Sequence, residues 1–315
     1  MGDQQVTTVQ AGRGPILAAA RPSQGAPRWR PQPLLFASPA VLLVVGLLYA
    51  PFVWTAYLSF TSYDGLNPPQ WTGLANYIGF FRDGILWVTV SNTLMWVAGT
   101  ILLPVGLGLF VATVTYRSRW GTLLRLPFLI PYAVSGAGVA VVWGFVLQPH
   151  GALNEVLAFL HLPGGHASLL ANRPVNTVVM IVASTWQQVG VNALLFLVGL
   201  QSIPEAPLEA ARLDGADGWR LFRYITWPLL RPLTAVVVGL AIVASLKTFD
   251  VVWVLTQGGP GRSSETLAVT MYRDTFVANE YGTGSTVAVV LTVIAGIASV
   301  LYLRGQLSSR RTVEW

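Results

Sequence analysis

The chain has 315 residues, of which 53% are hydrophobic and only 10% are charged. Soluble globular proteins carry about a quarter charged residues, so this composition excludes that class and indicates a membrane protein. The net charge of +6 does not indicate nucleic-acid binding, because the basic residues gather at the borders of apolar runs rather than along one polar face. The lack of cysteine excludes disulfides, thiolate metal sites and a cysteine nucleophile.

The first 33 residues are rich in Gly, Ala, Pro and Gln, and we expect them to form a disordered tail. A signal peptide is the alternative interpretation. However, the apolar run that follows, residues 34–60, is longer than a signal-peptide core and lacks a convincing small-residue cleavage site. This run is therefore predicted to be the first transmembrane helix.

A helix needs about 20 apolar residues to cross a bilayer. Runs of this length recur along the chain, and one of them is broken only by Lys247 and Asp250. Pro104 is expected to kink the second run. The predicted fold is all-α: one polytopic membrane domain over residues 34–304, followed by a C-terminal tail over residues 305–315. Its six transmembrane helices are expected at residues 34–60, 84–116, 126–147, 174–204, 232–255 and 281–303.

Lysine and arginine residues divide unequally between the two sets of connecting segments. Fourteen fall in the N-terminal tail, the second connection, the polar segment at 201–232 and the C-terminal tail, whereas the alternate loops hold four. The positive-inside rule therefore places both termini and the 201–232 segment in the cytoplasm. His150, His161 and His166 share one extracytoplasmic loop without carboxylates at zinc-ligand spacing, which favours a solvated loop over a metal site.

The 201–232 segment contains the sequence EAARLDGADGWRLFRYITWP, which begins at Glu209. Residues 208–213 are good helix formers, and Glu209 can pair with Arg212 three residues later. Gly215 is expected to end this helix in the left-handed conformation. The pattern predicts a short helix followed by a sharp turn.

A second, amphipathic helix is expected to follow, with Asp217 as its N-cap. Its apolar residues alternate with Arg220 and Arg223, so it could simply lie on the bilayer surface. The apolar positions are Trp219, Phe222, Tyr224 and Ile225.

The whole segment resembles the EAA signature, EAA-x3-G-x9-I-x-L-P, of the membrane subunits of binding-protein-dependent ABC importers. Every fixed letter is present except that Trp227 replaces the usual leucine. The resemblance implies a cytoplasmic coupling helix that docks on a separate ATPase. The residues implied to carry this coupling are Glu209, Ala210, Ala211, Gly215, Trp219, Arg220, Phe222, Ile225 and Pro228.

A second segment, residues 249–260, reads FDVVWVLTQGGP. It resembles the FD…LT-x-GGP signature of carbohydrate-type permeases, which include maltose and glycerol-3-phosphate importers. The run Gly258, Gly259 and Pro260 predicts a turn out of the fifth span. Gly73 with Asn76-Tyr77 also resembles the G-x-x-NY element of this family.

The two resemblances together imply a set of partners in a bacterial inner membrane. The GGP signature usually marks the maltose-F-like half of a heterodimeric pore, so a second permease chain is implied. Two ATPase subunits and an extracytoplasmic solute-binding protein complete the expected assembly. The large insertion and extra N-terminal helices of the maltose-F-like chain are absent here, so no substrate site equivalent to that chain's is carried over.

The chain has no ATP-binding motif of its own. A P-loop needs G-x-x-x-x-G-K-[ST], and the only lysine, Lys247, follows Leu246. We therefore expect no bound cofactor and no enzymatic activity, with ATP and Mg hydrolysed by the partner. The alternative is an ion-gradient-driven secondary transporter, which would show intramembrane acids and inverted repeats; Asp250 is the only acid well inside a predicted span. A purely structural scaffold is the third interpretation.

Two groups of polar residues are candidates for the substrate path. Lys247 and Asp250 stand three residues apart, and they either neutralise each other at a helix contact or line the pore. Thr185, Gln188 and Asn192 share one face of the fourth span. Amides beside an aromatic ring suit a sugar, whereas hydrogen bonding between helices is the alternative role. A single intramembrane cation favours a neutral sugar over glycerol phosphate.

Overall fold

The computed structural model describes residues 32–161 and 168–310, so most of the predicted N-terminal tail, His166 and residues 311–315 lie outside the described residues. The chain divides into two units, residues 1–50 and 51–315. In the first unit, α1 (Gln32–Val44) leads into the π-helical turn η1 (Val45–Tyr49). α2 (Ala50–Leu58) follows, and the second unit begins within it at Pro51. Helical residues 36–58 have a mean hydropathy of 2.1 and confirm the first predicted span.

The second unit is a bundle of long apolar helices. The second span is α4 (Leu86–Thr100), the π-helical turn η2 (Ile101–Val105) and α5 (Gly106–Thr115). The irregular turn falls at Pro104, which has no backbone N–H to donate. α9 (Val175–Gln201) and α15 (Tyr281–Arg310) are the fourth and sixth spans. These helices confirm the predicted all-α membrane fold.

α9 lies at the centre of the bundle, and small residues allow its neighbours to approach closely. A Cβ added at Gly190 would lie 2.1 Å from the carbonyl oxygen of Phe128. A Cβ added at Gly108 of α5 would lie 2.5 Å from the Cβ of Asn192. Close helix contacts of this kind are typical of membrane bundles, where small residues let backbones meet.

The third predicted span is not one continuous helix. α6 (Gly121–Leu129), the 3-10 turn η3 (Ile130–Ala133) and α7 (Gly136–Val146) replace it, with a bend of 102°. Pro131 cannot donate a helical hydrogen bond, and the Ser135 hydroxyl accepts from the backbone N–H of Gly138 at 3.1 Å to start a new helix. The chain therefore forms a broken span or a re-entrant segment here. α8 (Ala152–Phe159) follows in the loop.

The fifth predicted span is also interrupted. α12 (Trp227–Leu246) ends before Lys247, and α13 (Asp250–Thr256) begins three residues later. Apolar periodicity alone did not reveal this break, because residues on both sides are suitable for a membrane helix.

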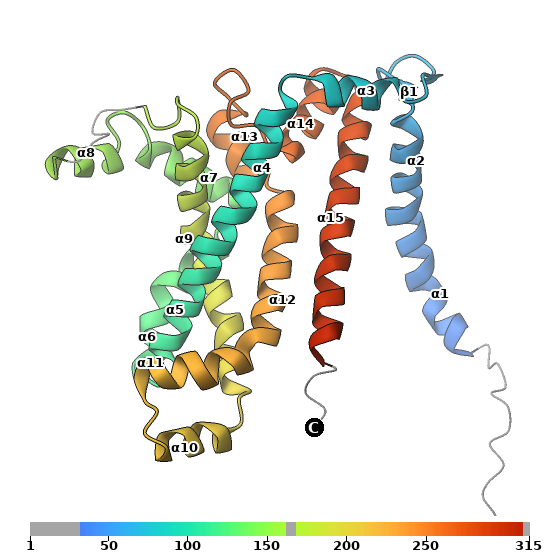
Figure 1. Cartoon of the computed structure of the whole chain (residues 1–315). Helices are drawn as coiled ribbons and strands as arrows, with labels where there is room; N and C mark the ends of the chain where they lie inside the picture. Colours follow the sequence, from blue (N-terminus) through green and yellow to red (C-terminus); the bar gives the residue numbers. More distant parts are fainter. Residues whose placement is uncertain (1–31, 162–167, 311–315) are drawn as a thin grey trace, which may run out of the picture. The chain divides into compact units, whose positions relative to one another are not determined.

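Short elements gather at the two ends of the second unit (Figure 1). At one end lie α10 (Glu205–Leu213), α11 (Gly218–Leu221) and the π-helical turn η4 (Phe222–Thr226). At the opposite end lies a second group of short elements, with the long helices between the two groups. These are the hairpin strands β1 (Thr61–Ser62) and β2 (Gln70–Trp71), α3 (Ala75–Arg82), α13, α14 (Leu267–Tyr272) and the π-helical turn η5 (Arg273–Val277).

Candidate functional site

α10 ends in a tight turn that depends on Gly215. The N–H of Ala216 donates to the carbonyl of Ala211 at 2.8 Å, and the N–H of Gly215 donates to Arg212 at 3.0 Å. These two bonds form a Schellman motif, and Gly215 has a φ of +79° as the motif requires. An added Cβ at Gly215 would meet no atom within 4 Å, so the need for glycine is purely conformational. The predicted left-handed helix end is confirmed.

The two faces of α10 have different surroundings. Leu208 and Ala211 are 5% and 7% exposed, and Leu208 packs into the hydrophobic core beside Leu200 and Ile203. The opposite face, Glu209, Ala210, Arg212 and Leu213, is exposed, and Leu213 has 90% of its surface free. α10 is thus fixed to the bundle on one side and presents the other side outward. Among the described residues no ion pair joins Glu209 to Arg212, so that predicted pair does not form here.

The predicted amphipathic helix is present as α11 and η4. The backbone carbonyl of Asp217 accepts from the N–H of Arg220 at 3.0 Å, but its side chain makes no cap hydrogen bond. Ile225 packs against the hydrophobic core of the chain itself. Trp219 is 73% exposed and stacks on Phe222 with ring centroids 5.5 Å apart. Pro228 stands in the first turn of α12, and Arg220 is exposed.

The polar face of α9 is divided by burial. Thr185 and Asn192 are each 7% exposed, and both donate to carbonyls of their own helix, those of Ile181 and Gln188. Asn192 lies at the close contact with Gly108. Gln188 is only half-buried. Of the three predicted path residues on α9, Gln188 alone is partly accessible in this structure.

Lys247 and Asp250 are separated by the break between α12 and α13. Both are exposed, and no ion pair joins them within the described part of the chain. A Cβ added at Gly136 would lie 2.9 Å from Asp250 Oδ2, so this carboxylate sits beside the first turn of α7. Free backbone N–H groups at a helix N-terminus favour a negative charge. Asp250 therefore lies beside the N-terminus of α7, without an ion pair to Lys247 among the described residues.

The GGP run forms the predicted turn out of the fifth span. α13 ends at Thr256, Gln257 has a φ of 50°, and Gly258 has a φ of +82°. A Cβ at Gly258 would lie only 2.4 Å from the Cγ of Glu265. Gly258 is required by its backbone conformation and by the close approach of Glu265.

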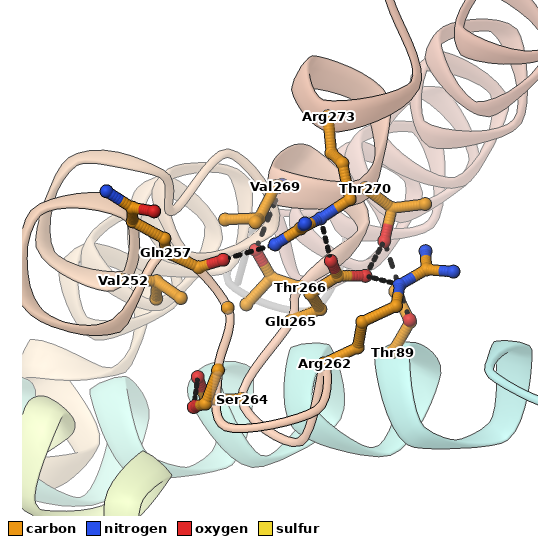
Figure 2. Close-up of polar contacts among 12 residues, drawn as sticks. Thr89, Val252, Gln257, Arg262, Ser264, Glu265, Thr266, Val269, Thr270 and Arg273 are labelled. Carbon is orange, nitrogen blue, oxygen red and sulfur yellow. Dashed lines mark hydrogen bonds and ion pairs between the residues drawn. The ribbon is translucent and has the colours of Figure 1, made fainter. Parts of the chain in front are cut away.

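Glu265 is the functional candidate that sequence reasoning missed. Its side chain is fully buried between Arg262, whose Nε lies 2.8 Å from Oε2, and Arg273, which pairs with Oε1 (Figure 2). The hydroxyl of Thr270 donates to the same carboxylate at 3.1 Å. Arg273 also donates to the carbonyl of Gln257. A charged loop residue is usually solvated, so nothing at Glu265 itself predicts burial. The nearby Arg262 and Arg273 are the only sequence feature that could have indicated this cluster.

Polar residues of α4 attach the Glu265 loop to the second span. Asn92 donates through its side-chain amide to the carbonyls of Ser263 and Glu265 at 2.8 and 2.9 Å. The N–H of Leu267 donates to the hydroxyl of Thr93 at 3.1 Å. The hydroxyl of Thr266 donates to the carbonyl of Thr248 at 2.9 Å, inside the break of the fifth span. The loop therefore connects the second and fifth spans at this end.

Asp274 lies in η5, outside the spanning helices and close to the same charges. Burial raises the pKa of its carboxyl from 3.8 to about 6; Arg262 opposes this shift, and Glu265 adds to it. Between these two values the folded chain holds a proton that the unfolded chain has released. Asp274 therefore reduces the stability of the fold as the pH rises from 3.8 to about 6.

The G-x-x-NY element has a structural role in the described chain. Asn76 donates to the carbonyls of Ser59 and Thr61 at 3.0 and 2.8 Å, and the Tyr77 hydroxyl hydrogen-bonds to the Ser59 hydroxyl at 2.8 Å. Gly73 has a φ of +61° in the turn before α3. These contacts hold α3 against the end of α2. No group of three His, Asp or Glu side chains within residues 32–161 and 168–310 is placed to hold a metal.

The family model described as "Binding-protein-dependent transport system inner membrane component" matches residues 104–313, well over half of the chain. The chain belongs to this family. The match includes α10, its Schellman turn and the Glu265 loop, so both sites lie in the part that the permease shares with the family.

Individual relatives agree with this assignment. A probable ABC transporter permease of Pyrococcus horikoshii is 34% identical over 280 residues, covering 87% of this permease and 94% of that protein. A sulfoquinovosyl glycerol transport system permease of Agrobacterium fabrum is 36% identical over 281 residues, covering 86% and 88%. A chain of the bacterial alginate ABC transporter, solved with an alginate-pentasaccharide-bound periplasmic protein, has a TM-score of 0.76 and 19% identity, covering 89% and 95%. At that identity the structural likeness shows the fold alone.

Proposed function

We propose that this permease forms half of the pore of an ATP-driven importer for a sugar or oligosaccharide, working by alternating access. The observation that carries the proposal is the two-sided α10. Its apolar residues Leu208 and Ala211 are fixed in the bundle, while Glu209, Ala210, Arg212 and Leu213 project from its end. A helix presenting such a face suits docking into a groove of a partner protein, because buried anchors and rim charges together give register and affinity.

The anchoring of α10 explains how movement could pass into the membrane. Leu208 belongs to the same core cluster as Leu200 of α9, Ala112 of α5 and Val237 of α12. Well-packed interiors transmit displacement rather than absorbing it. A movement of α10 driven by the ATPase would therefore reach three spans at once.

The proposed substrate class is supported by chemistry and by relatives. Amide and hydroxyl groups on α9 suit a polyhydroxylated ligand. Beside them, the rings of Trp186 and Trp143 meet edge to face, with centroids 6.5 Å apart. The Agrobacterium relative is named for sulfoquinovosyl glycerol, and the structural neighbour was solved with an alginate pentasaccharide on its periplasmic protein. Lys247 is the only Lys or Arg within the six predicted spans, which favours a neutral sugar over glycerol phosphate.

The proposed assembly contains a second permease chain, two ATPase subunits that hydrolyse ATP with Mg, and an extracytoplasmic binding protein. The proposed topology places both termini and α10 in the cytoplasm of a bacterial cell. The segregation of basic residues supports this orientation. α10 and the Glu265 loop also lie at opposite ends of the bundle, as this topology requires (Figure 1).

Uptake by the assembled complex in sealed vesicles is expected to require ATP and to be insensitive to ionophores. The reason is that the chain lacks a P-loop and an array of intramembrane acids for ion coupling. Labelled sugar is followed with ATP, without ATP and with an ionophore. Uptake that continues without ATP and collapses with the ionophore would support the secondary-transporter alternative instead.

Cysteine labelling tests the proposed path, since the natural chain has no cysteine. Gln188→Cys is expected to react with a small water-soluble thiol reagent at least severalfold faster than Asn192→Cys, because Gln188 is half-buried and Asn192 is packed against Gly108. Val198→Cys is the control, because Val198 is an exposed apolar residue of α9 at a position that suits contact with lipid. Failure of Gln188→Cys to label in any nucleotide state would leave hydrogen bonding between helices as its role.

A further inference from the structure

An apolar cavity of about 610 Å³ opens next to the coupling segment. It lies between α5, the junction of α9 with α10, and the α11–η4 segment. Glu209 and Arg212, on the exposed face of α10, do not line it, whereas Trp219 and Phe222 of the implied coupling set do. Its apolar walls are formed mainly by Leu109, Phe110, Val114, Ile203, Leu208 and Phe222.

The polar lining of the cavity is restricted and carries one sign of charge. Arg117 is the single charged residue among the described residues that line it, and its side chain is exposed. Thr113, Tyr116 and Thr226 supply hydroxyl groups, and the exposed Trp219 also lines the cavity. A cavity with apolar walls and one accessible cation matches an amphiphile with an apolar tail and an anionic head.

The depth of the cavity matches a membrane interface. The second span ends at Thr115, so the lining residues of α5 extend from inside the span to just beyond it. An exposed arginine and an exposed tryptophan at the end of a span are typical of the headgroup level, where amphipathic side chains gather. A ligand in this position would have its tail in the hydrocarbon layer and its head at the surface.

We propose that this cavity binds an acyl chain of an anionic phospholipid, whose phosphate pairs with Arg117. Leu208 and Phe222, which belong to the coupling segment, would contact the chain on one side, and Leu109 and Phe110 of α5 would contact it on the other. The bound lipid would then fill the space between α5 and the segment that we propose receives force from the ATPase.

The test uses the whole complex, purified in detergent and mixed with phosphatidylglycerol or phosphatidylcholine of the same acyl composition. Bound lipid is counted by native mass spectrometry. Gly106→Phe is expected to abolish retention of phosphatidylglycerol, because Gly106 lines the cavity and an added Cβ there meets no atom within 4 Å. The matched control is Gly296→Phe on α15. An added Cβ at Gly296 also meets no atom within 4 Å, but Gly296 does not line the cavity, so this variant should retain the lipid.

The headgroup contact is tested separately. Arg117→Gln should weaken phosphatidylglycerol binding about fivefold, because each basic residue near a bilayer surface contributes a factor of that order for anionic lipid. It should weaken phosphatidylcholine binding less, because the choline ammonium offsets the charge of that lipid's phosphate. Arg119→Gln, also exposed but outside the lining, should change neither. Equal retention of both lipids by the natural chain, or full retention by Gly106→Phe, would overturn the proposal. Cross-linking of a photoreactive residue at Phe110 to the ATPase rather than to lipid would also overturn it.

Discussion

Glu209→Lys is expected to reduce ATP-driven uptake to background while the chain still inserts into the membrane. Glu209 lies on the exposed face of α10, and no ion pair holds it within the described part of the chain. Its carboxylate is free to meet a basic group on the ATPase, and charge reversal would place two cations together. Loss of a desolvated charge pair costs about 2–5 kcal/mol of association free energy.

The measurement is co-purification of the ATPase, followed by uptake in vesicles. Glu209→Lys should lose the ATPase. His161→Ala, just after α8 at the opposite end of the bundle from α10 (Figure 1), should retain it. Affinity for the binding protein should not change. Normal uptake and normal co-purification by Glu209→Lys would contradict the role proposed for this face.

Gly215 allows the same helix to be tested through its geometry. Gly215→Val should also abolish uptake, because a β-branched residue at a φ of +79° is strained and would redirect α10. Gly215→Asn should largely restore uptake, since asparagine tolerates the left-handed conformation and nothing lies within 4 Å of the added Cβ. Equal activity of the valine and asparagine variants would show that the Schellman turn is not needed for coupling.

Glu265→Gln is expected to destabilise the permease by about 3 kcal/mol. The substitution keeps the side-chain volume but removes the carboxylate that pairs with both Arg262 and Arg273, whose side chains are 32% and 29% exposed. Removing one partner of a buried ion pair is costly because the remaining charges stay desolvated. The expected result is a clear fall in the midpoint of thermal unfolding, followed by tryptophan fluorescence in detergent.

The matched control is Glu155→Gln on the exposed surface of α8, which should stay within about 0.5 kcal/mol of the natural chain. Gly258→Ala should resemble Glu265→Gln, because the new Cβ would collide with the Glu265 side chain. An unchanged midpoint for Glu265→Gln would mean that the two arginines find other partners, and the cluster would not stabilise this end of the bundle.

The sequence by itself determined the membrane class, the positions of the continuous spans and the two motif turns. Repeated uncharged apolar runs of about 20 residues have the length that spans a bilayer, and turns such as those at Gly215 and Gly258 need conformations that local residue type dictates. These features depend on short stretches of chain, so a reader of the sequence can recognise them without knowing which segments meet.

Only the tertiary structure decided the features that depend on distant contacts. The bend near Pro131 and the break after Leu246 arise where neighbouring elements provide alternative hydrogen bonds, such as that from Thr266 to the carbonyl of Thr248. The separation of Lys247 from Asp250 follows from that break. Glu265 looked like an ordinary loop carboxylate until the fold enclosed it between two arginines, because burial is a property of the assembled chain and not of the residue.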